Sequence, residues 1–197
     1  MKINIGCGSI LKKGWINADV RWKRGEEWRK EQEKLGYPSV TWKSACDPWD
    51  FKDNVFDYVF SEHMIEHVNA SNGLKMLKEA YRTLKSDGVI RIVCPSREFY
   101  ESLRNKDYDP FVINYMKLIH NRDASIGSAN YVVNRTLNGQ GHLWVPTSEQ
   151  LVNQIKKAGF KNVKLCKYGI SEHKELNNLE VQDKLRPVES ICAEGTK

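Results

Sequence analysis

Four predicted strands each end on residues that could contact a ligand. A strand over residues 2–5 runs into Gly6-Cys7-Gly8, and strands over 15–20, 40–47 and 56–61 end near Asp19, Asp47 and Ser61-Glu62-His63. In an open parallel sheet, ligands bind beyond the carboxyl ends of the strands, where the strand order reverses. Together, the four sets of residues indicate one shared ligand site.

The glycines of the first loop suit close contact between backbone and ligand. Gly6 and Gly8 carry no side chain, and Asp19, about a dozen residues later, can accept hydrogen bonds from both hydroxyls of a ribose. Taken alone, Gly-x-Gly is equally typical of a tight turn. A dinucleotide is not indicated, because Leu11 stands at the third glycine of its fingerprint and residues 9–14 are too few for a crossover helix.

A second pattern, His63-Met64-Ile65-Glu66-His67, matches the inverted zinc-protease motif. On a helix it would place two histidines one turn apart. A catalytic zinc also needs a third protein ligand, and the downstream sequence singles out none. A zinc hydrolase that uses His63 and His67 is therefore a remote alternative, and we predict no metal site. The more ordinary interpretation is that Glu66 and His67 hydrogen-bond their neighbours.

Strand and helix patterns alternate along the chain. Helices are predicted over the charged residues 21–38, after Ser61, along the stripe Leu74, Leu77, Tyr81 and Leu84 up to residues 86–88, and from the capping-box pair Thr147 and Gln150. Further strands are predicted over 89–94, 163–168 and 188–193. The alternation predicts an α/β fold with a mostly parallel sheet covered on both faces.

Residues 96–145 form one long connection after the fifth strand. Its aromatic residues are Phe99, Tyr100, Tyr108, Phe111, Tyr115 and Tyr131, with Trp144 near its end. Connections of this length are usually functional or disordered, and the aromatic content argues against disorder. We expect residues 96–145 to be an inserted cap on the substrate side of a single domain that spans 1–197.

Length and composition agree with one soluble domain. The chain has 197 residues, of which 40% are hydrophobic, enough for a core without disulfide or metal. No apolar stretch approaches the roughly 18 residues of a spanning helix, and the start lacks the pattern of a signal peptide. The five cysteines contain no Cys-x-x-Cys and are expected to be reduced thiols in the core. We expect a cytoplasmic protein without membrane contact.

The net charge of +6 permits an acidic partner without demanding one. The densest basic stretch, residues 21–31, also carries three acidic side chains, which is typical of a solvated, salt-bridged surface. A nucleic-acid partner is therefore possible but not favoured, since phosphate binding needs a clustered basic face. The aromatic residues of the insert suit stacking on a sugar ring, so a small molecule is favoured as the binding partner.

Four segments follow one another in the order and spacing of a known family: Ile3-Asn4-Ile5-Gly6-Cys7-Gly8, Gly14-Trp15-Ile16-Asn17-Ala18-Asp19, 56–67 and 82–93. In these segments the chain resembles the class I S-adenosylmethionine-dependent methyltransferases. More narrowly, it resembles short predicted methyltransferases with a Gly-Cys-Gly loop, a Gly-Trp-Ile-Asn strand and a Ser-Glu-His and Glu-His pair. The resemblance implies a three-layer Rossmann-like fold whose seven-stranded sheet is mostly parallel with an antiparallel last strand.

The resemblance also implies a cofactor, S-adenosyl-L-methionine, and the residues that hold it. These would be Gly6, Cys7 and Gly8 at the aminocarboxypropyl end, Asp19 and Val20 at the ribose, Asp47, Pro48 and Trp49 at the adenine, and Ser61 to His63 near the sulfonium. The chain departs from the family pattern at Ile10, which replaces the third glycine of the loop, and at Asp87, which replaces a turn glycine.

We therefore expect a methyltransferase that moves a methyl group to an oxygen or nitrogen of a small-molecule or saccharide-like acceptor by in-line displacement. His63 and His142 are predicted to flank the transferred methyl, one as general base and the other binding the acceptor, with Glu62 as the substitute base. The alternatives are a cofactor-binding module without catalysis and a nucleic-acid methyltransferase.

Overall fold

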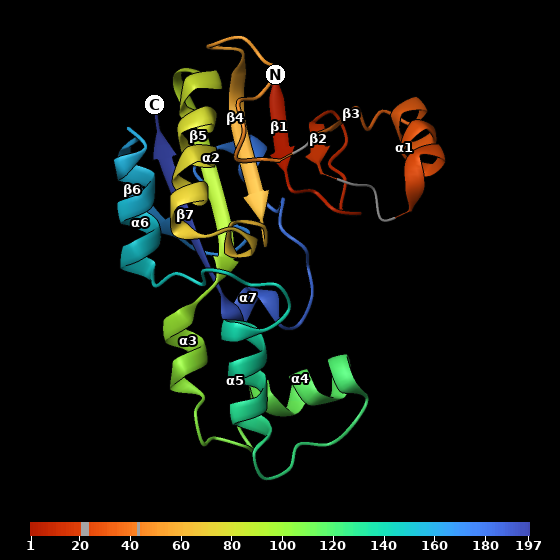
Figure 1. Ribbon diagram of the computed structural model, residues 1–197, viewed down its shortest axis with the longest axis vertical. Coiled ribbons are helices and arrows are strands. Elements are labelled where there is room, and N and C mark those ends of the chain that lie inside the picture. The colour runs from red at the N-terminus through yellow and green to blue at the C-terminus, as the bar shows by residue number, and fades with distance from the viewer. Residues whose placement is uncertain (21–23, 43) are drawn as a thin grey trace.

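The computed structural model describes residues 1–20, 24–42 and 44–197, and its centre is a seven-stranded sheet (Figure 1). The strands are β1 (Lys2–Ile5), β2 (Ile16–Asp19), β3 (Ser39–Thr41), β4 (Phe56–Glu62), β5 (Leu84–Pro95), β6 (Lys161–Cys166) and β7 (Ser190–Thr196). Their order is β3-β2-β1-β4-β5-β7-β6, and β7 pairs antiparallel with both β5 and β6. The predicted mostly parallel sheet with an antiparallel last strand is confirmed.

The helices are distributed unevenly around this sheet. They are α1 (Gly25–Lys34), α2 (Ala70–Thr83), α3 (Arg97–Ser102), α4 (Pro110–His120), α5 (Ser128–Asn138), α6 (Ser148–Lys157) and α7 (Arg186–Glu189), with 3₁₀ turns η1 (Ile65–His67) and η2 (Lys174–Leu176). Side chains of α2 and α6, such as Met76 and Ile155, pack in the main core against strand residues such as Ile3 and Ile90. Within the described residues, no helix is long and apolar enough to cross a membrane.

The opposite face of the sheet is covered by the stretch between β6 and α7. Arg91 of β5 is fully buried there, and its guanidinium donates to Glu180 Oε1 and Glu194 Oε1, each at 2.6 Å. It also donates to the backbone oxygens of Lys167 (3.0 Å) and Ile170 (3.1 Å). Removing one partner of a buried ion network leaves an uncompensated charge. Arg91 thus fixes the segment that covers this face.

The loop between β1 and β2 is held by two buried asparagines instead of a helix. Asn17 Oδ1 accepts from the Lys12 amide at 2.7 Å, and Asn17 Nδ2 donates to the backbone oxygens of Lys12 (3.1 Å) and Trp15 (2.9 Å). Asn4 Nδ2 donates to Ile10 O at 3.1 Å. The side chains of two neighbouring strands therefore satisfy loop backbone groups that a helix would satisfy internally.

Several predicted boundaries are wrong. The strand expected over 40–47 ends at Thr41, after which the described residues form turns. The helix expected to include Leu84 ends at Thr83, because Leu84 already pairs with Phe56 at the start of β5. The expected turn at 86–88 is an irregularity inside β5, where Asp87 takes a φ of +63°. Of the helix expected over 21–38, residues 21–23 lie outside the described residues.

The charged surface around α1 follows the expected salt-bridged pattern. Arg29 donates to Glu26 at 2.6 Å and to Glu33 at 2.7 Å, the i,i+3 and i,i+4 partners that share one helix face. The charge of Arg29 is therefore at least partly neutralised within the helix.

The segment over 96–145 folds into α3, α4 and α5, which lie beyond the carboxyl ends of β4 and β5 (Figure 1). These helices enclose a second hydrophobic cluster, which includes Tyr100, Phe111, Tyr115, Val132 and Leu137. The aromatic side chains therefore build a core of their own. The assignment of this segment as a cap over an acceptor stays a prediction.

Candidate functional site

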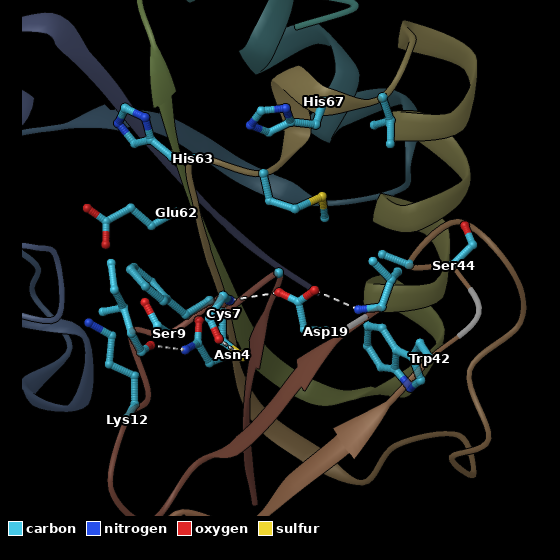
Figure 2. Close-up of a pocket in the computed structure, with 18 of the residues that line it drawn as sticks. Asn4, Cys7, Ser9, Lys12, Asp19, Trp42, Ser44, Glu62, His63 and His67 are labelled. Carbon is cyan, nitrogen blue, oxygen red and sulfur yellow. Dashed lines mark hydrogen bonds between the residues drawn. The ribbon is translucent and has the colours of Figure 1, made fainter. Parts of the chain in front are cut away.

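A cavity of about 650 Å³ opens at the carboxyl ends of β1, β2 and β4 (Figure 2). Lys12 and Glu62 lie on one side of the cavity, and Trp42 and Ser44 lie on the other. Volumes of this order are typical of sites for small molecules and cofactors. The cavity lies where the sequence predicted a shared ligand site, at the point where β1 has β2 on one side and β4 on the other.

The Gly6-Cys7-Gly8 loop lines the cavity. The amides of Gly6 and Cys7 both donate to Ala18 O, at 2.8 and 3.2 Å, so the loop folds over the end of β2. Gly6 takes a φ of +65°, and a Cβ on it would come within 2.1 Å of Met64 Cγ. Only glycine fits this contact. Burial raises the pKa of the Cys7 thiol to about 12, which makes it an inert wall of the cavity.

Asp19 ties the two sides of this site together. Its Oδ2 accepts from the Gly8 amide and its Oδ1 from the Val20 amide, both at 2.7 Å, and both bonds are visible in Figure 2. The Trp42 amide donates to Asp19 O at 2.8 Å. Asp19 and Val20 both line the cavity. The carboxylate therefore positions the glycine loop as well as facing the space where a ligand would lie.

The residues expected at the adenine lie elsewhere. Asp47 and Pro48 are exposed, and the Trp49 side chain is buried, with its Nε1 donating to Ala45 O at 2.9 Å; none of the three lines the cavity. Because β3 ends early, the chain turns at Trp42, and Trp42, Ser44 and Ala45 line the cavity instead. The expected contact of Asp47, Pro48 and Trp49 with the cofactor stays a prediction, and the geometry of the cavity favours Trp42, Ser44 and Ala45 in their place.

Trp42 has two features that fit a ring-shaped ligand. Its indole stacks on Trp49, with ring centroids 4.9 Å apart and planes at 21°. Its Nε1 is buried and has no hydrogen-bond partner among the described residues. A buried donor without a partner is costly, and the rest of the Trp42 side chain lines the cavity, where a ring could pack against it.

Of the three residues at the end of β4, Ser61 faces inward and does not line the cavity. It is buried, and its hydroxyl donates to Ile5 O at 3.1 Å; its contact with the cofactor stays a prediction. Glu62 does line the cavity, but its Oε1 accepts from Tyr168 Oη (2.8 Å) and the Val181 amide (3.0 Å), and it pairs with Arg186 Nη1 (3.1 Å). Because these contacts already occupy the Glu62 carboxylate, it is better suited to holding neighbouring groups in place than to the predicted role of substitute base.

His63 lines the cavity in a left-handed backbone conformation, with a φ of +51°. Its Nε2 lies 3.0 Å from Ser190 Oγ, and its Nδ1 faces Glu66 Oε1 at 3.5 Å. Burial, together with the positive charge of Arg186, lowers the pKa of His63 to about 3. The ring is therefore neutral at physiological pH, and both of its nitrogens already face protein groups.

His142 does not line the cavity. Its ring packs edge-on against His67, with centroids 4.8 Å apart, and its Nδ1 lies 2.6 Å from Thr136 O. His67 does line the cavity, and it follows the fully buried Glu66, whose pKa burial raises to about 8. His63 and His142 therefore do not flank one open space. The zinc-hydrolase pattern also fails, because His63 precedes the short η1 instead of sharing a helix face with His67.

Other residues of the cavity come from distant parts of the chain. Arg186 of α7 and Gln140, just after α5, line it together with Lys12 of the first loop. Lys12 lies over the Phe60 ring at 5.5 Å, and burial lowers its pKa. Sequence patterns do not identify Arg186 or Gln140, because neither stands at the end of a predicted strand.

A family model and several solved structures are similar to this chain. Residues 17–92, from β2 to most of β5, match the family model described as a methyltransferase domain. A Thermotoga maritima structure, described as a S-adenosylmethionine-dependent methyltransferase and possible histamine N-methyltransferase, aligns with a TM-score of 0.58 at 20% identity, covering 100% of this chain and 81% of that one. The family model covers less than half of the chain, and the solved structures show that the chain has the fold of S-adenosylmethionine-dependent methyltransferases.

Two more proteins show the breadth of this likeness. A Haemonchus contortus phosphoethanolamine N-methyltransferase 2 in complex with S-adenosyl-L-methionine aligns with a TM-score of 0.58 at 17% identity, over 100% of this chain and 48% of that one. An uncharacterised Methanocaldococcus jannaschii protein is 26% identical over 183 residues, which cover 93% of this chain and 74% of that protein. The structures that share the fold of this chain thus include one that holds S-adenosyl-L-methionine.

Features of the cavity fit this cofactor. Gly6, Asp19 and Trp42 all line the cavity, and they offer a ligand a bare stretch of backbone, a carboxylate and an indole ring. When bound, S-adenosylmethionine supplies an electrophilic methyl group on a positively charged sulfur. The residues that would hold it are those of the glycine loop, Asp19 and Trp42.

Proposed function

We propose that this protein is a methyltransferase that binds S-adenosylmethionine in the cavity between the glycine loop and Trp42 and transfers the methyl group to an oxygen or nitrogen of a small-molecule or saccharide-like acceptor. The observation that carries the proposal is the position of Asp19, whose carboxylate bonds the loop at Gly8 and also lines the cavity. In the transfer, the carbon–sulfur bond breaks as the bond from methyl carbon to acceptor forms, and the acceptor loses one proton.

The charges around the cavity support a small polar acceptor. Lys12, Arg186 and Glu62 all line the cavity, and Arg186 is paired with Glu62, so the lining contains both positive and negative groups. A protein that binds a nucleic-acid backbone needs a continuous positively charged surface along the phosphates. A compact acceptor with a few hydrogen-bonding groups matches the mixed lining better.

The chemistry that this cavity offers is mainly positioning. A base with a pKa near the working pH is the most effective one, and the depressed pKa of His63 is far below it. Holding the cofactor and the acceptor in line, with water excluded, can by itself supply much of a rate enhancement. In this proposal His63 orients the acceptor through its neutral ring, and the acceptor's proton is lost with little help from a strong base.

The test is methyl transfer from labelled S-adenosylmethionine to a panel of polyols, sugars, small amines and tRNA. We expect label in a sugar, hydroxyl or amine compound, with the Asp19→Ala variant as the matched control that loses transfer at limiting cofactor. Transfer confined to tRNA, with binding that weakens steeply as salt rises, would contradict the choice of acceptor class. Cofactor binding without transfer to any member of so broad a panel would contradict it as well.

A further inference from the structure

Three side chains that can bind a metal ion meet beside the cavity. Glu66 and His67 belong to η1, and His142 lies in the stretch between α5 and α6. One ligand atom from each of the three lies within 4.8 Å of the others. The two segments are fixed to each other, since Glu66 O accepts from the amides of Leu143 (2.7 Å) and Trp144 (3.2 Å). The cluster is thus built by the fold.

Each of the two imidazole rings is oriented so that one of its nitrogens can bind a metal ion. His142 Nδ1 lies 2.6 Å from Thr136 O, and His67 Nδ1 lies 3.3 Å from Gly141 O. A backbone carbonyl only accepts hydrogen bonds, so each Nδ1 carries the hydrogen and each Nε2 keeps its lone pair. Histidines that bind metals almost always donate their other ring N–H to a carbonyl or carboxylate in this way.

Glu66 is the group in the cluster that needs a partner. Its side chain has 0% relative exposure, and neither carboxylate oxygen has a hydrogen-bond partner among the described residues. Burying a polar group without a partner is costly, and buried carboxylates are normally paired or bound to a metal. The nearest ring nitrogen outside the cluster, His63 Nδ1, lies at 3.5 Å, beyond good hydrogen-bond range.

We propose that Glu66, His67 and His142 bind a divalent transition-metal cation such as Zn²⁺. Two histidines and one glutamate are a ligand set of catalytic zinc sites, which keep a fourth position open. Bound ligand atoms would lie about 3.4 Å apart, so small side-chain rotations close the cluster. The site differs from the zinc pattern considered in the sequence, because His142 of the insert takes the place of His63.

The location suggests what this cation does. His67 lines the cavity, and the open position is therefore accessible from it. If the proposed methyl transfer is correct, on which this step rests, the acceptor's oxygen or nitrogen occupies that position. A Lewis acid there lowers the pKa of the acceptor group and orients it, which supplies the proton chemistry that His63 is poorly suited to perform.

Metal binding is tested with the full chain after treatment with a chelator. Co²⁺ is added, and the visible absorption of bound cobalt and the metal content by mass spectrometry are measured; Zn²⁺ is then added in competition. We expect one cobalt per chain, displaced by zinc. Glu66→Gln and His142→Ala should each weaken cobalt binding at least tenfold, and His120→Ala, which changes a histidine of the insert outside the cluster, should leave it unchanged.

The result that overturns the proposal is a wild-type chain that takes up no cobalt at millimolar concentration, or binding that the two cluster variants leave unchanged. Glu66→Gln keeps the shape of the side chain, so its circular dichroism and melting should show a folded protein. Calorimetric titration with S-adenosylmethionine, with chelator present, separates the two claims. Cofactor binding without cobalt binding refutes only the metal site, and cobalt binding without cofactor binding supports the metal site and refutes the proposed function.

Discussion

Replacing Asp19 by alanine should weaken cofactor binding by about ten- to a hundredfold. The carboxylate lines the cavity, and a charge-assisted hydrogen bond to ribose hydroxyls contributes roughly 1.5 to 3 kcal/mol, which corresponds to that loss. The substitution also removes the acceptor of the Gly8 and Val20 amides, each bonded at 2.7 Å. Because both amides can reach water, we expect the free energy of unfolding to fall by only about 1 to 2 kcal/mol.

Asp47→Ala is the matched control, since it removes the same charge from an exposed position outside the cavity. Its cofactor affinity should change by less than about threefold. The assay is calorimetric titration of both variants with S-adenosylmethionine and S-adenosylhomocysteine, with urea unfolding for stability. Equal losses of affinity in the two variants, or an unchanged affinity in Asp19→Ala, would refute the assignment of the ribose to Asp19.

Four further predictions concern loop geometry, stability and catalysis. Gly6→Ala should lower the free energy of unfolding, measured in urea, by about 2 to 4 kcal/mol, because the new Cβ is strained and clashes with Met64. Gly8→Ala should lower it by only about 1 to 2 kcal/mol, because a Cβ at that position meets no atom within 4 Å. Asn17→Ala should cost about 3 kcal/mol, because it leaves several loop backbone groups unbonded; a loss below 1 in urea unfolding would contradict this. Burial raises the pKa of Glu189 to about 7, so its protonated form stabilises the fold fully below pH 4.5, and this contribution is lost as the pH rises through 7. Glu189→Gln should thus match the wild type at pH 4 and exceed it by up to about 3 kcal/mol at pH 8, and an equal gap at both pH values in thermal melts would be inconsistent with burial of the charge. His63→Ala should lower turnover of an identified acceptor about a hundredfold, because the acceptor loses a group that orients it, with cofactor affinity changed less than about threefold; a matching loss of affinity would make His63 a cofactor-binding residue.

The parts of the site that the sequence predicts are those set by local geometry. Gly6 and Gly8 lie in the loop that follows β1, and Asp19 is the last residue of β2, so their place at one edge of a parallel sheet follows from the strand pattern alone. Asp47 lies outside the cavity, because the third strand is shorter than the same pattern predicts. β3 is an edge strand that ends at Thr41, and Trp42 is held at the cavity by the bond of its amide to Asp19 O, a contact with no sequence signature.

The parts that could not be predicted depend on contacts between distant segments. Arg186 reaches the cavity through its ion pair with Glu62, and His142 reaches His67 because the amides after it bond to Glu66 O. One local signal was available for the first loop. Asn17 is a polar residue inside an apolar strand, and such a residue needs buried partners, which the loop backbone provides.

The most direct test of the central claim is a crystal structure of the chain with S-adenosylhomocysteine. The account predicts the ligand in the cavity, with its ribose hydroxyls within hydrogen-bond distance of the Asp19 carboxylate, its amino-acid end against the loop from Gly6 to Gly8, and its adenine beside Trp42. A ligand bound elsewhere, or an adenine held by Asp47 and Trp49 with Trp42 facing away, would contradict it.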